Sequence, residues 1–164
     1  MMKLRNANRK HEQGQSLVEL SLVLVVFLLL VMGVVDLGRV FFYYISMYDA
    51  AEEGVFFGSI YSPDGTNNAA VCTKIEDRAK TSLTDPTDTT VTVIVSFFNG
   101  ANRVACRSAT KAQASIGSAI EVAITQSSFA LVTPILPTFI GRSTVGLTTK
   151  IQGNILKQCV GTGC

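Results

Sequence analysis

The hydrophobic pattern opens with an apolar run from Ser16 to Val35, twenty residues that hold a single charged side chain, Glu19. As a helix rising about 1.5 Å per residue, the run is roughly 30 Å long, which matches the hydrocarbon core of a bilayer. A cleavable secretory signal has a shorter apolar core, about 7–15 residues, and a small-x-small cleavage site. No such site follows Met32. The pattern therefore favours a retained transmembrane helix over residues 15–35.

The same helix is predicted to continue over residues 36–61, because no proline or glycine cluster interrupts it. Apolar residues recur there at three- and four-residue spacing, which defines one helical face. This face comprises Leu37, Phe41, Tyr44, Tyr48, Ala51, Val55 and Gly58. We expect the face to cover a sheet, although Phe41 and Tyr44 would equally suit a membrane interface. Asp36 and Arg39 are three residues apart and can pair at the membrane boundary.

A turn cluster from Ser62 to Gly65 ends this helix. A second helix is expected to start at Asn67 or Asn68, either of which can cap it, and to run to about Leu83. Beyond it the apolar residues alternate in three segments, 89–98, 118–127 and 144–153. Three such strands and a covering helix predict an α+β domain with one antiparallel sheet.

The segment from Phe129 to Ile140 is apolar but contains Pro134 and Pro137. It therefore cannot form a regular central strand or a long helix. We expect a connection packed on the sheet. The alternative is an exposed apolar patch that docks on another subunit or on the membrane surface, as large exposed patches do. Gly54 and Gly58, four residues apart, more often indicate close packing than a dimer face in a segment outside the membrane.

Charge divides the chain at the apolar run. Four basic residues and no acidic residue lie within the first eleven positions: Lys3, Arg5, Arg9 and Lys10. Ten basic and ten acidic residues follow Val35, so that part is neutral. Basic residues before the span predict a cytoplasmic N-terminus and an extracytoplasmic C-terminal domain. A neutral exported part offers no electrostatic footprint for nucleic acid.

The four cysteines, Cys72, Cys106, Cys159 and Cys164, lie on the predicted exported side, where thiols can be oxidised. Four cysteines allow three connectivities, and the sequence cannot choose among them. We favour a Cys72–Cys106 bond and a Cys159–Cys164 bond. A metal site is the weaker alternative, because the spacing has no CxxC and the exported part has no histidine.

Enzyme chemistry is not indicated. The single histidine, His11, lies in the basic leader, which excludes a Ser-His or Cys-His mechanism in the exported domain. Carboxylates such as Glu76 and Glu121 form no motif and are expected to be solvated, and no glycine-rich phosphate loop is present. We therefore expect no catalytic activity, cofactor, metal or small-molecule substrate.

The junction before the apolar run carries the most specific signal. Inserting an acidic side chain into a membrane costs about 2.5–3.5 kcal/mol at the centre of the spanning helix and less near its end. A residue such as Glu19 therefore usually has a function and a partner. By itself it could snorkel to the cytoplasmic interface. A basic leader ending in Gly14, then Gln15, then Glu19 resembles a type IV prepilin processing site. The resemblance implies that a membrane prepilin peptidase cleaves after Gly14, and that Glu19 pairs with the freed Gln15 amine of a neighbouring subunit.

Three further stretches narrow the resemblance to TadE-like proteins of the tight-adherence pilus system. They are 14–20 (GQSLVEL), 34–41 (VVDLGRVF) and 49–54 (DAAEEG). The C-terminal strands and proline-containing stretch are also similar. At Leu20 the major pilins of this system carry Tyr, so the departure indicates a minor subunit. The resemblance implies a pseudopilin of the bacterial cytoplasmic membrane that works with other pilin-like subunits and the pilus assembly machinery, either in the filament or as an assembly factor.

The implied organisation is a leader over 1–14, a transmembrane helix over 15–35 and an extracytoplasmic domain over 36–164. A second hypothesis keeps the anchor but assigns the domain a different purpose. In it, the chain is a single-pass, membrane-tethered module that binds an extracellular ligand. The two hypotheses differ at Gly14 and Glu19, which only the first requires.

Overall fold

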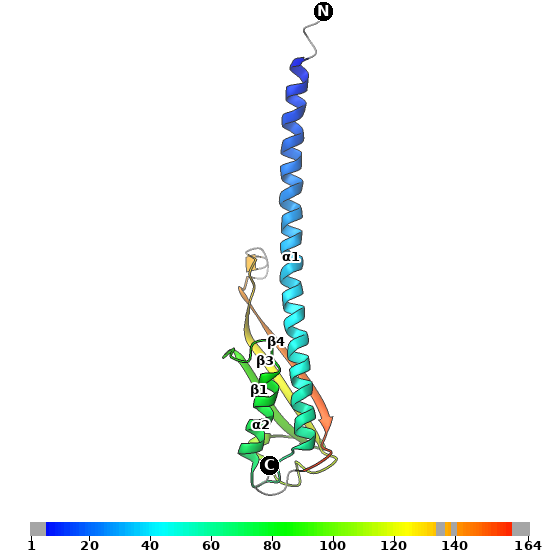
Figure 1. The fold of residues 1–164 in the computed structure, drawn as a ribbon, viewed down its shortest axis with the longest axis vertical. Helices are drawn as coiled ribbons and strands as arrows, with labels where there is room; N and C mark the ends of the chain where they lie inside the picture. Colours follow the sequence, from blue (N-terminus) through cyan, green and yellow to red (C-terminus); the bar gives the residue numbers. More distant parts are fainter. Residues whose placement is uncertain (1–5, 134–136, 139–140, 159–164) are drawn as a thin grey trace, which may run out of the picture. The chain divides into compact units, whose positions relative to one another are not determined.

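The computed structural model describes residues 6–133, 137–138 and 141–158, with side chains from Gly14 onward within these ranges. Its elements are α1 (Asn6–Ile60), α2 (Asn68–Thr81), β1 (Val91–Asn99), β2 (Asn102–Ala105), the short 3-10 helix η1 (Cys106–Ser108), β3 (Ala119–Ala130) and β4 (Thr144–Asn154) (Figure 1). They confirm the predicted α+β class. The chain divides into two compact units, one of residues 1–39 and 131–143, the other of residues 40–130 and 144–164.

The second unit contains one antiparallel sheet with strand order β2-β1-β3-β4. β1 and β3 pair from Val91 opposite Gln126 to Phe98 opposite Ala119, and β4 pairs along β3 with a bulge after Gln126. β1, β3 and β4 confirm the three predicted strands. β2 was missed, so the sheet has four strands rather than about three. β2 has four residues, of which only Val104 is partly buried, and this is too few to show an alternating pattern.

The core of this unit forms where α1 and α2 cover one face of the sheet. The inward side chains of β1 and β3 are at most 8% exposed, as the alternation predicted: Val91, Val93, Val95, Phe97, Ile120, Val122 and Ile124. Gly54 of α1 lies against α2 and β3, and a Cβ on Gly58 would stand 2.3 Å from the end of Ile120. Close helix packing, rather than a dimer face, thus explains this glycine pair.

The inward face of α1 matches the predicted one at Ala51, Val55 and Gly58, but not at its aromatic positions. The residues that pack inward are Met47, Ala50, Ala51, Gly54, Val55 and Gly58. Phe41, Tyr44 and Tyr48, which were expected to cover the sheet, are 65%, 41% and 45% exposed. Apolar residues occur nearly all round this helix, so periodicity alone could not select a face. The sheet is covered by the row with the smallest side chains, because these let the two backbones approach.

α2 begins at Asn68 as expected and ends at Thr81, two residues before Leu83. Asn67 occupies the cap position without a capping hydrogen bond from its side chain. Asn67 Oδ1 accepts a hydrogen bond from the backbone N–H of Asp64 at 3.3 Å. Asn68 Oδ1 accepts one from the backbone N–H of Gly65 at 3.0 Å. Both asparagines therefore stabilise the preceding turn, which enters α2 from the end of α1.

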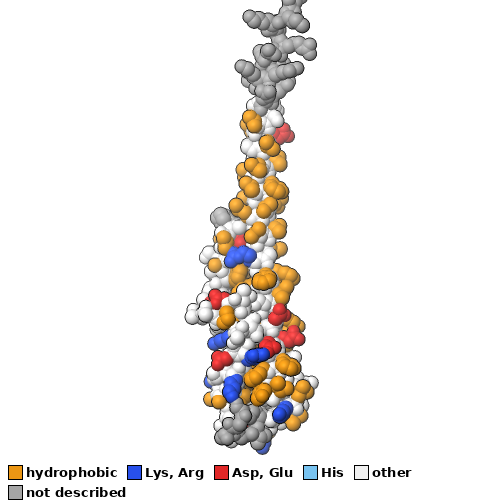
Figure 2. Space-filling view, viewed as in Figure 1, with side chains coloured by type: hydrophobic (Ala, Val, Ile, Leu, Met, Phe, Trp, Pro, Cys, Tyr) orange, Lys and Arg blue, Asp and Glu red, His pale blue; other side chains and the backbone are white. Residues whose placement is uncertain are grey.

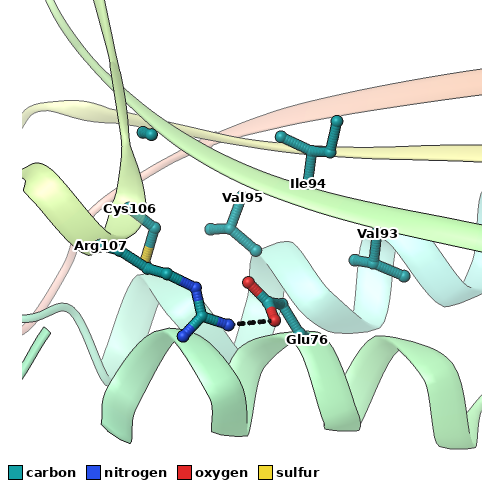
Figure 3. A pocket seen from close by; sticks show the side chains of 7 residues that line it. Glu76, Val93, Ile94, Val95, Cys106 and Arg107 are labelled. Atoms are coloured by element: carbon teal, nitrogen blue, oxygen red, sulfur yellow. Dashed lines mark hydrogen bonds and ion pairs between the residues drawn. The ribbon is translucent and has the colours of Figure 1, made fainter. Parts of the chain in front are cut away.

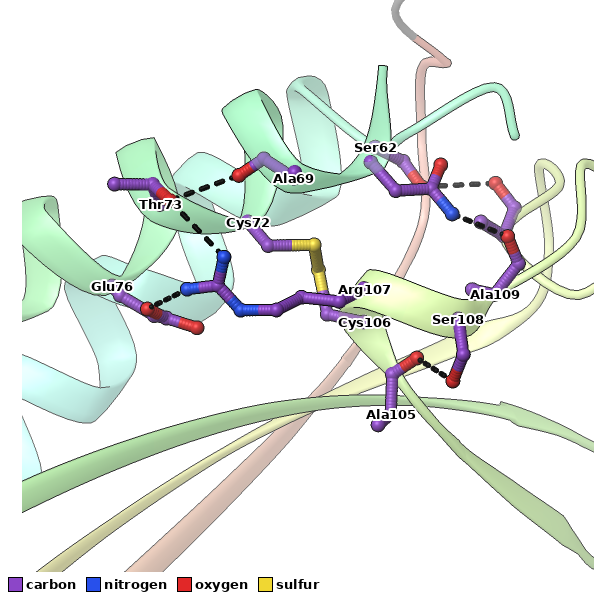
Figure 4. Close-up of a disulfide and its surroundings, with 12 residues drawn as sticks. Ser62, Ala69, Cys72, Thr73, Glu76, Ala105, Cys106, Arg107, Ser108 and Ala109 are labelled. Atoms are coloured by element: carbon purple, nitrogen blue, oxygen red, sulfur yellow. Dashed lines mark hydrogen bonds and ion pairs between the residues drawn. A yellow bond between two sulfur atoms is a disulfide. The ribbon is translucent and has the colours of Figure 1, made fainter. Parts of the chain in front are cut away.

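A disulfide between Cys72 of α2 and Cys106 of η1 confirms the first predicted pairing (Figure 4). The two Cα atoms are 5.9 Å apart, and both side chains are buried. Closing a loop of this length removes conformational entropy from the unfolded chain, which contributes about 3–4 kcal/mol to stability. Cys159 and Cys164 lie outside the described residues.

The outer face of the sheet holds a buried carboxylate. Glu121 is 6% exposed, its Oε1 lies 2.8 Å from Arg103 Nη2, and Gln152 Nε2 donates to its Oε2 at 2.8 Å. The expectation that Glu121 is solvated is therefore wrong. Gln152 on the adjacent strand β4 and Arg103 on β2, which lies beyond β1, cover it; a strand taken alone cannot reveal such contacts.

A polar cluster joins α1 to the bulge of β3. Asp88 accepts hydrogen bonds from Tyr43 Oη at 3.4 Å and from Gln126 Nε2 at 3.0 Å, and from the amide and hydroxyl of Thr90. The Thr90 hydroxyl contributes most to lowering the pKa of Asp88 below its usual value. Burial, followed by the charge of Asp88, raises the pKa of Tyr43 to about 12. Asp88 thus stays ionised and Tyr43 neutral at neutral pH.

Replacing Gly153 with alanine should destabilise the second unit. A Cβ there would lie 2.5 Å from Cγ1 of Val55, a β-branched side chain with little rotamer freedom. Overpacking of this kind costs about 1–3 kcal/mol. Urea unfolding of the full chain in detergent, followed by near-UV circular dichroism, measures the loss. Gly146→Ala on the same strand is the control, since its Cβ would meet nothing closer than 3.8 Å. Equal stability of the two variants would contradict the packing argument.

Candidate functional site

The first part of α1 presents an uncovered apolar surface. Every side chain from Leu17 to Met32 is exposed, and Figure 2 shows hydrophobic side chains along this stretch of the helix. Within the described residues, α1 is the one helix long and apolar enough to cross a membrane by length and composition. Apolar area left in water costs about 25 cal/mol per Å². The surface therefore requires a lipid or protein environment.

Glu19 interrupts this apolar surface near its start. Its side chain is exposed and has no hydrogen-bond or ion-pair partner among the residues whose side chains are described. Gly14, Gln15 and Leu20 lie on the same helix and are also exposed. Gln15 and Glu19 are four residues apart, so they occupy one face of the helix, a single turn from each other. The structure thus places the predicted processing and assembly residues together on one helical segment.

Asp36, directly after the apolar run, is in contrast buried and bonded to other residues of the chain. It is 2% exposed, and both the backbone N–H of Thr133, at 3.0 Å, and the Thr133 hydroxyl donate to its Oδ2. Arg39 Nη1 lies 3.8 Å from Oδ1, so the predicted pair forms, with Arg39 47% exposed. Hydrogen bonds to a charged group contribute about 1.5–3 kcal/mol each, more than an exposed ion pair. Thr133 is therefore the principal partner of Asp36.

The Thr133 contact was not predicted. Ninety-seven positions separate the two residues, and no motif around Thr133 points to Asp36. The backbone N–H of Leu131 donates to the carbonyl of Ser143 at 3.1 Å, which closes the connection between β3 and β4 at its base. The described residues 131–133 of this connection are held to α1 at Asp36. Residues 134–136 and 139–140 lie outside the described residues, so packing of this stretch on the sheet stays a prediction.

The second unit contains a small pocket of about 180 Å³ between α2, β1 and η1 (Figure 3). Its lining residues are Glu76, Val93, Ile94, Val95, Ala105, Cys106 and Arg107. Arg107 Nη2 donates to Glu76 Oε2 at 2.7 Å, so the two charges of the pocket neutralise each other. Ligand sites usually enclose about 300–1,000 Å³. Among the described residues, no three His, Cys, Asp or Glu side chains gather where they could hold a metal ion.

These features describe a chain whose N-terminal helix could anchor it in a membrane and which also forms an α+β unit. Residues 14–55 match the family described as TadE-like protein. No match was found among curated proteins or solved structures. The matched segment starts at Gly14 and contains Glu19, Asp36 and Arg39. The match confirms the TadE-like resemblance over this segment.

Removing the Asp36 carboxylate should loosen the segment around Thr133. In Asp36→Ala the Thr133 amide and hydroxyl lose their acceptor, so amide exchange of residues 131–133 should accelerate by about one to two orders of magnitude, the equivalent of roughly 1.5–3 kcal/mol. Hydrogen-exchange mass spectrometry of the detergent-solubilised chain measures this.

Arg39→Ala is the matched control for this experiment. It leaves both Thr133 bonds in place and removes the half-exposed partner that lies 3.8 Å from Asp36, so we expect a smaller rise in exchange than in Asp36→Ala. Faster exchange in Arg39→Ala than in Asp36→Ala would show that the ion pair, rather than Thr133, organises this region.

Proposed function

We propose that the chain is a membrane-anchored minor pilin-like subunit, or pseudopilin, that acts in the assembly or initiation of a tight-adherence pilus. The observation that carries the proposal is Glu19, a carboxylate with no partner among the described side chains, on an exposed apolar helix within the TadE-like segment. The anchor is residues 15–35 in the bacterial cytoplasmic membrane. Residues 1–14 form a cytoplasmic leader, and residues 36–164 form an extracytoplasmic domain.

The leader is removed by a prepilin peptidase that cuts between Gly14 and Gln15. The support for this step is the residue pattern: basic residues, then glycine, then the start of an apolar helix with Glu19 five positions beyond Gly14. Cleavage converts a peptide nitrogen of Gln15 into an amino group that is largely protonated at neutral pH. Processing thereby creates a cation at the start of the apolar segment.

That cation is the partner we assign to Glu19 in a neighbouring subunit. A carboxylate at the edge of the hydrocarbon region is unfavourable by itself and is stabilised by an opposite charge within a few ångströms. Because Gln15 and Glu19 share one helical face, two subunits can bring an amine and a carboxylate together by packing these faces side by side. The subunit is then most stable when it is docked. Leu20 beside Glu19, in place of the Tyr of major pilins, supports a minor subunit.

The exposed stripe of Phe41, Tyr44, Ile45 and Tyr48 on α1 supports docking as well. These residues are 65%, 41%, 41% and 45% exposed and repeat at three- and four-residue spacing. A stripe with this period is the arrangement through which one helix packs against another. Other pilin-like subunits are therefore the expected partners, together with the pilus assembly machinery.

The disulfide supports the extracytoplasmic position of the second unit. Disulfides persist in oxidising compartments and are rare in the cytosol. The Cys72–Cys106 bond is buried in the core, where it fixes α2 to the sheet through η1. The basic leader supports the same orientation, with the N-terminus in the cytoplasm.

The alternative, a tethered module that binds an extracellular ligand, needs a site in the second unit. The pocket beside Glu76 and Arg107 is small, and its two charges are paired with each other. It offers little for recognition of a small molecule. The alternative also assigns no role to Glu19, so the pilus-assembly proposal accounts for more of the molecule.

N-terminal sequencing of the membrane-bound protein tests the processing step. We expect Gln15 as the first residue in cells that contain a prepilin peptidase. Gly14→Lys should block cleavage, because a long charged side chain replaces the small residue at the cut, and should leave the longer chain in the membrane. Gly33→Ala is the matched glycine control, since a Cβ there meets nothing within 4 Å. A wild-type chain that starts at Met1 or Met2 would contradict the proposal.

Replacing Glu19 with alanine or glutamine should leave membrane insertion intact and reduce pilus assembly severely. Either change removes the charge that docks the neighbouring amino terminus, while glutamine keeps the size and polarity. Membrane fractionation and counts of surface pili separate the two outcomes. Glu52→Ala provides the control, because Glu52 is also an exposed acid on α1 but lies outside the apolar run. Normal piliation with Glu19→Gln would show that the charge of Glu19 is dispensable.

A further inference from the structure

The turn formed by Leu131, Val132 and Thr133, here called the boundary turn, has its position set by Asp36. Both donors of Thr133 bond to the Asp36 carboxylate, which directly follows Val35, the last residue of the apolar run. The turn and residues 1–39 belong to the same compact unit. If residues 15–35 span the bilayer, as proposed above, residue 36 marks the outer boundary of the hydrocarbon region. The boundary turn then lies at that boundary too.

The chemistry of the turn suits a lipid surface. Val132 is 68% exposed, and Leu131 is half-buried beside it. From Phe129 to Gly141 the sequence contains no charged residue, and the first one after it, Arg142, is basic. Moving apolar side chains from water into an apolar environment is favourable, so an uncharged apolar stretch suits lipid better than water. A basic residue at its edge favours contact with anionic headgroups.

The backbone N–H groups of the turn and of the residues after it also suit a region with little water. A buried or lipid-facing N–H without a partner is costly. The N–H of Leu131 donates to Ser143, that of Thr133 to Asp36, and that of Gly141 to Pro137 at 2.8 Å. Pro134 and Pro137 have no N–H to satisfy. The donors of this connection are thus either bonded internally or absent at each of these positions.

We propose that the boundary turn is a second membrane contact, in which Val132 inserts into the outer headgroup region of the bilayer. The contact rests on the proposed anchor and adds to it, because a helix alone leaves rotation about its own axis free. Asp36 acts as the positioning residue that couples the turn to the anchor. Lipid is favoured over a second protein because the turn stands level with the end of the lipid-facing run. A basic residue, Arg142, also directly precedes Ser143, whose carbonyl accepts a hydrogen bond from the N–H of Leu131 in the turn.

Tryptophan fluorescence tests the contact, since the chain contains no tryptophan. Val132→Trp is introduced into the full chain, which is reconstituted at one copy per nanodisc in phosphatidylcholine and phosphatidylglycerol. Lipids brominated near the headgroup end of the acyl chain serve as quenchers. We expect a blue-shifted emission that these lipids quench. Ile116→Trp is the matched control, because Ile116 is also 68% exposed but lies in the second unit; its emission should stay red-shifted and unquenched.

Two further variants distinguish the reasons for failure. Leu28→Trp reports the anchor: quenching there, with none at Val132→Trp, would overturn the second contact and leave the anchor standing. Absence of quenching at Leu28→Trp would overturn both.

Adding Asp36→Ala to Val132→Trp should abolish quenching, and quenching that persists would overturn the positioning role of Asp36. Val132→Trp emission that is shielded from aqueous acrylamide yet unquenched by bromolipid would show a protein cover instead, which also contradicts the proposal.

Discussion

The apolar surface of α1 is unfavourable in water and needs an apolar environment. That environment differs from one stretch of this continuous helix to the next. Between Leu17 and Met32 no described part of the chain covers it, whereas from Met47 to Gly58 a row of small residues lies against α2 and the sheet. Close approach there depends on glycine and alanine, because larger side chains would hold the backbones apart. Leucine, valine and phenylalanine dominate the first stretch, where no close protein neighbour has to be accommodated. Composition along α1 thus matches the environment each stretch requires.

Two acidic residues, Glu19 inside the apolar run and Asp36 directly after it, have different partners and therefore different roles. Asp36 is satisfied within its own chain by Thr133 and Arg39, so it acts as a structural residue. Glu19 has no such partner among the described side chains and belongs to the proposed subunit interface. A carboxylate that the fold has already paired contributes to stability and offers little to a second molecule. One that the fold leaves unpaired in an apolar setting gains most from an external cation.

The second unit is reinforced well beyond what its small core provides. The Cys72–Cys106 bond ties α2 to η1, Arg107 pairs with Glu76 beside it, and Glu121 joins β2, β3 and β4 on the outer face. Covalent and polar ties of this kind add stability to a small domain, in which hydrophobic burial alone is limited.

Most of the fold and the anchor could be predicted from the sequence, because they depend on local pattern: the apolar run of α1, the period of α2, the alternation of β1, β3 and β4, and the spacing of Gly14, Glu19 and Asp36. The Cys72–Cys106 pair was favoured but not determined. Tertiary structure alone decided which face of α1 turns inward, since apolar residues surround that helix and only contact with the sheet selects the small ones. It also decided the burial of Glu121, the pairing of β2, and the bond from Thr133 to Asp36. Each of these joins residues distant in sequence, and the energy that fixes them exists only once the chain has brought them together.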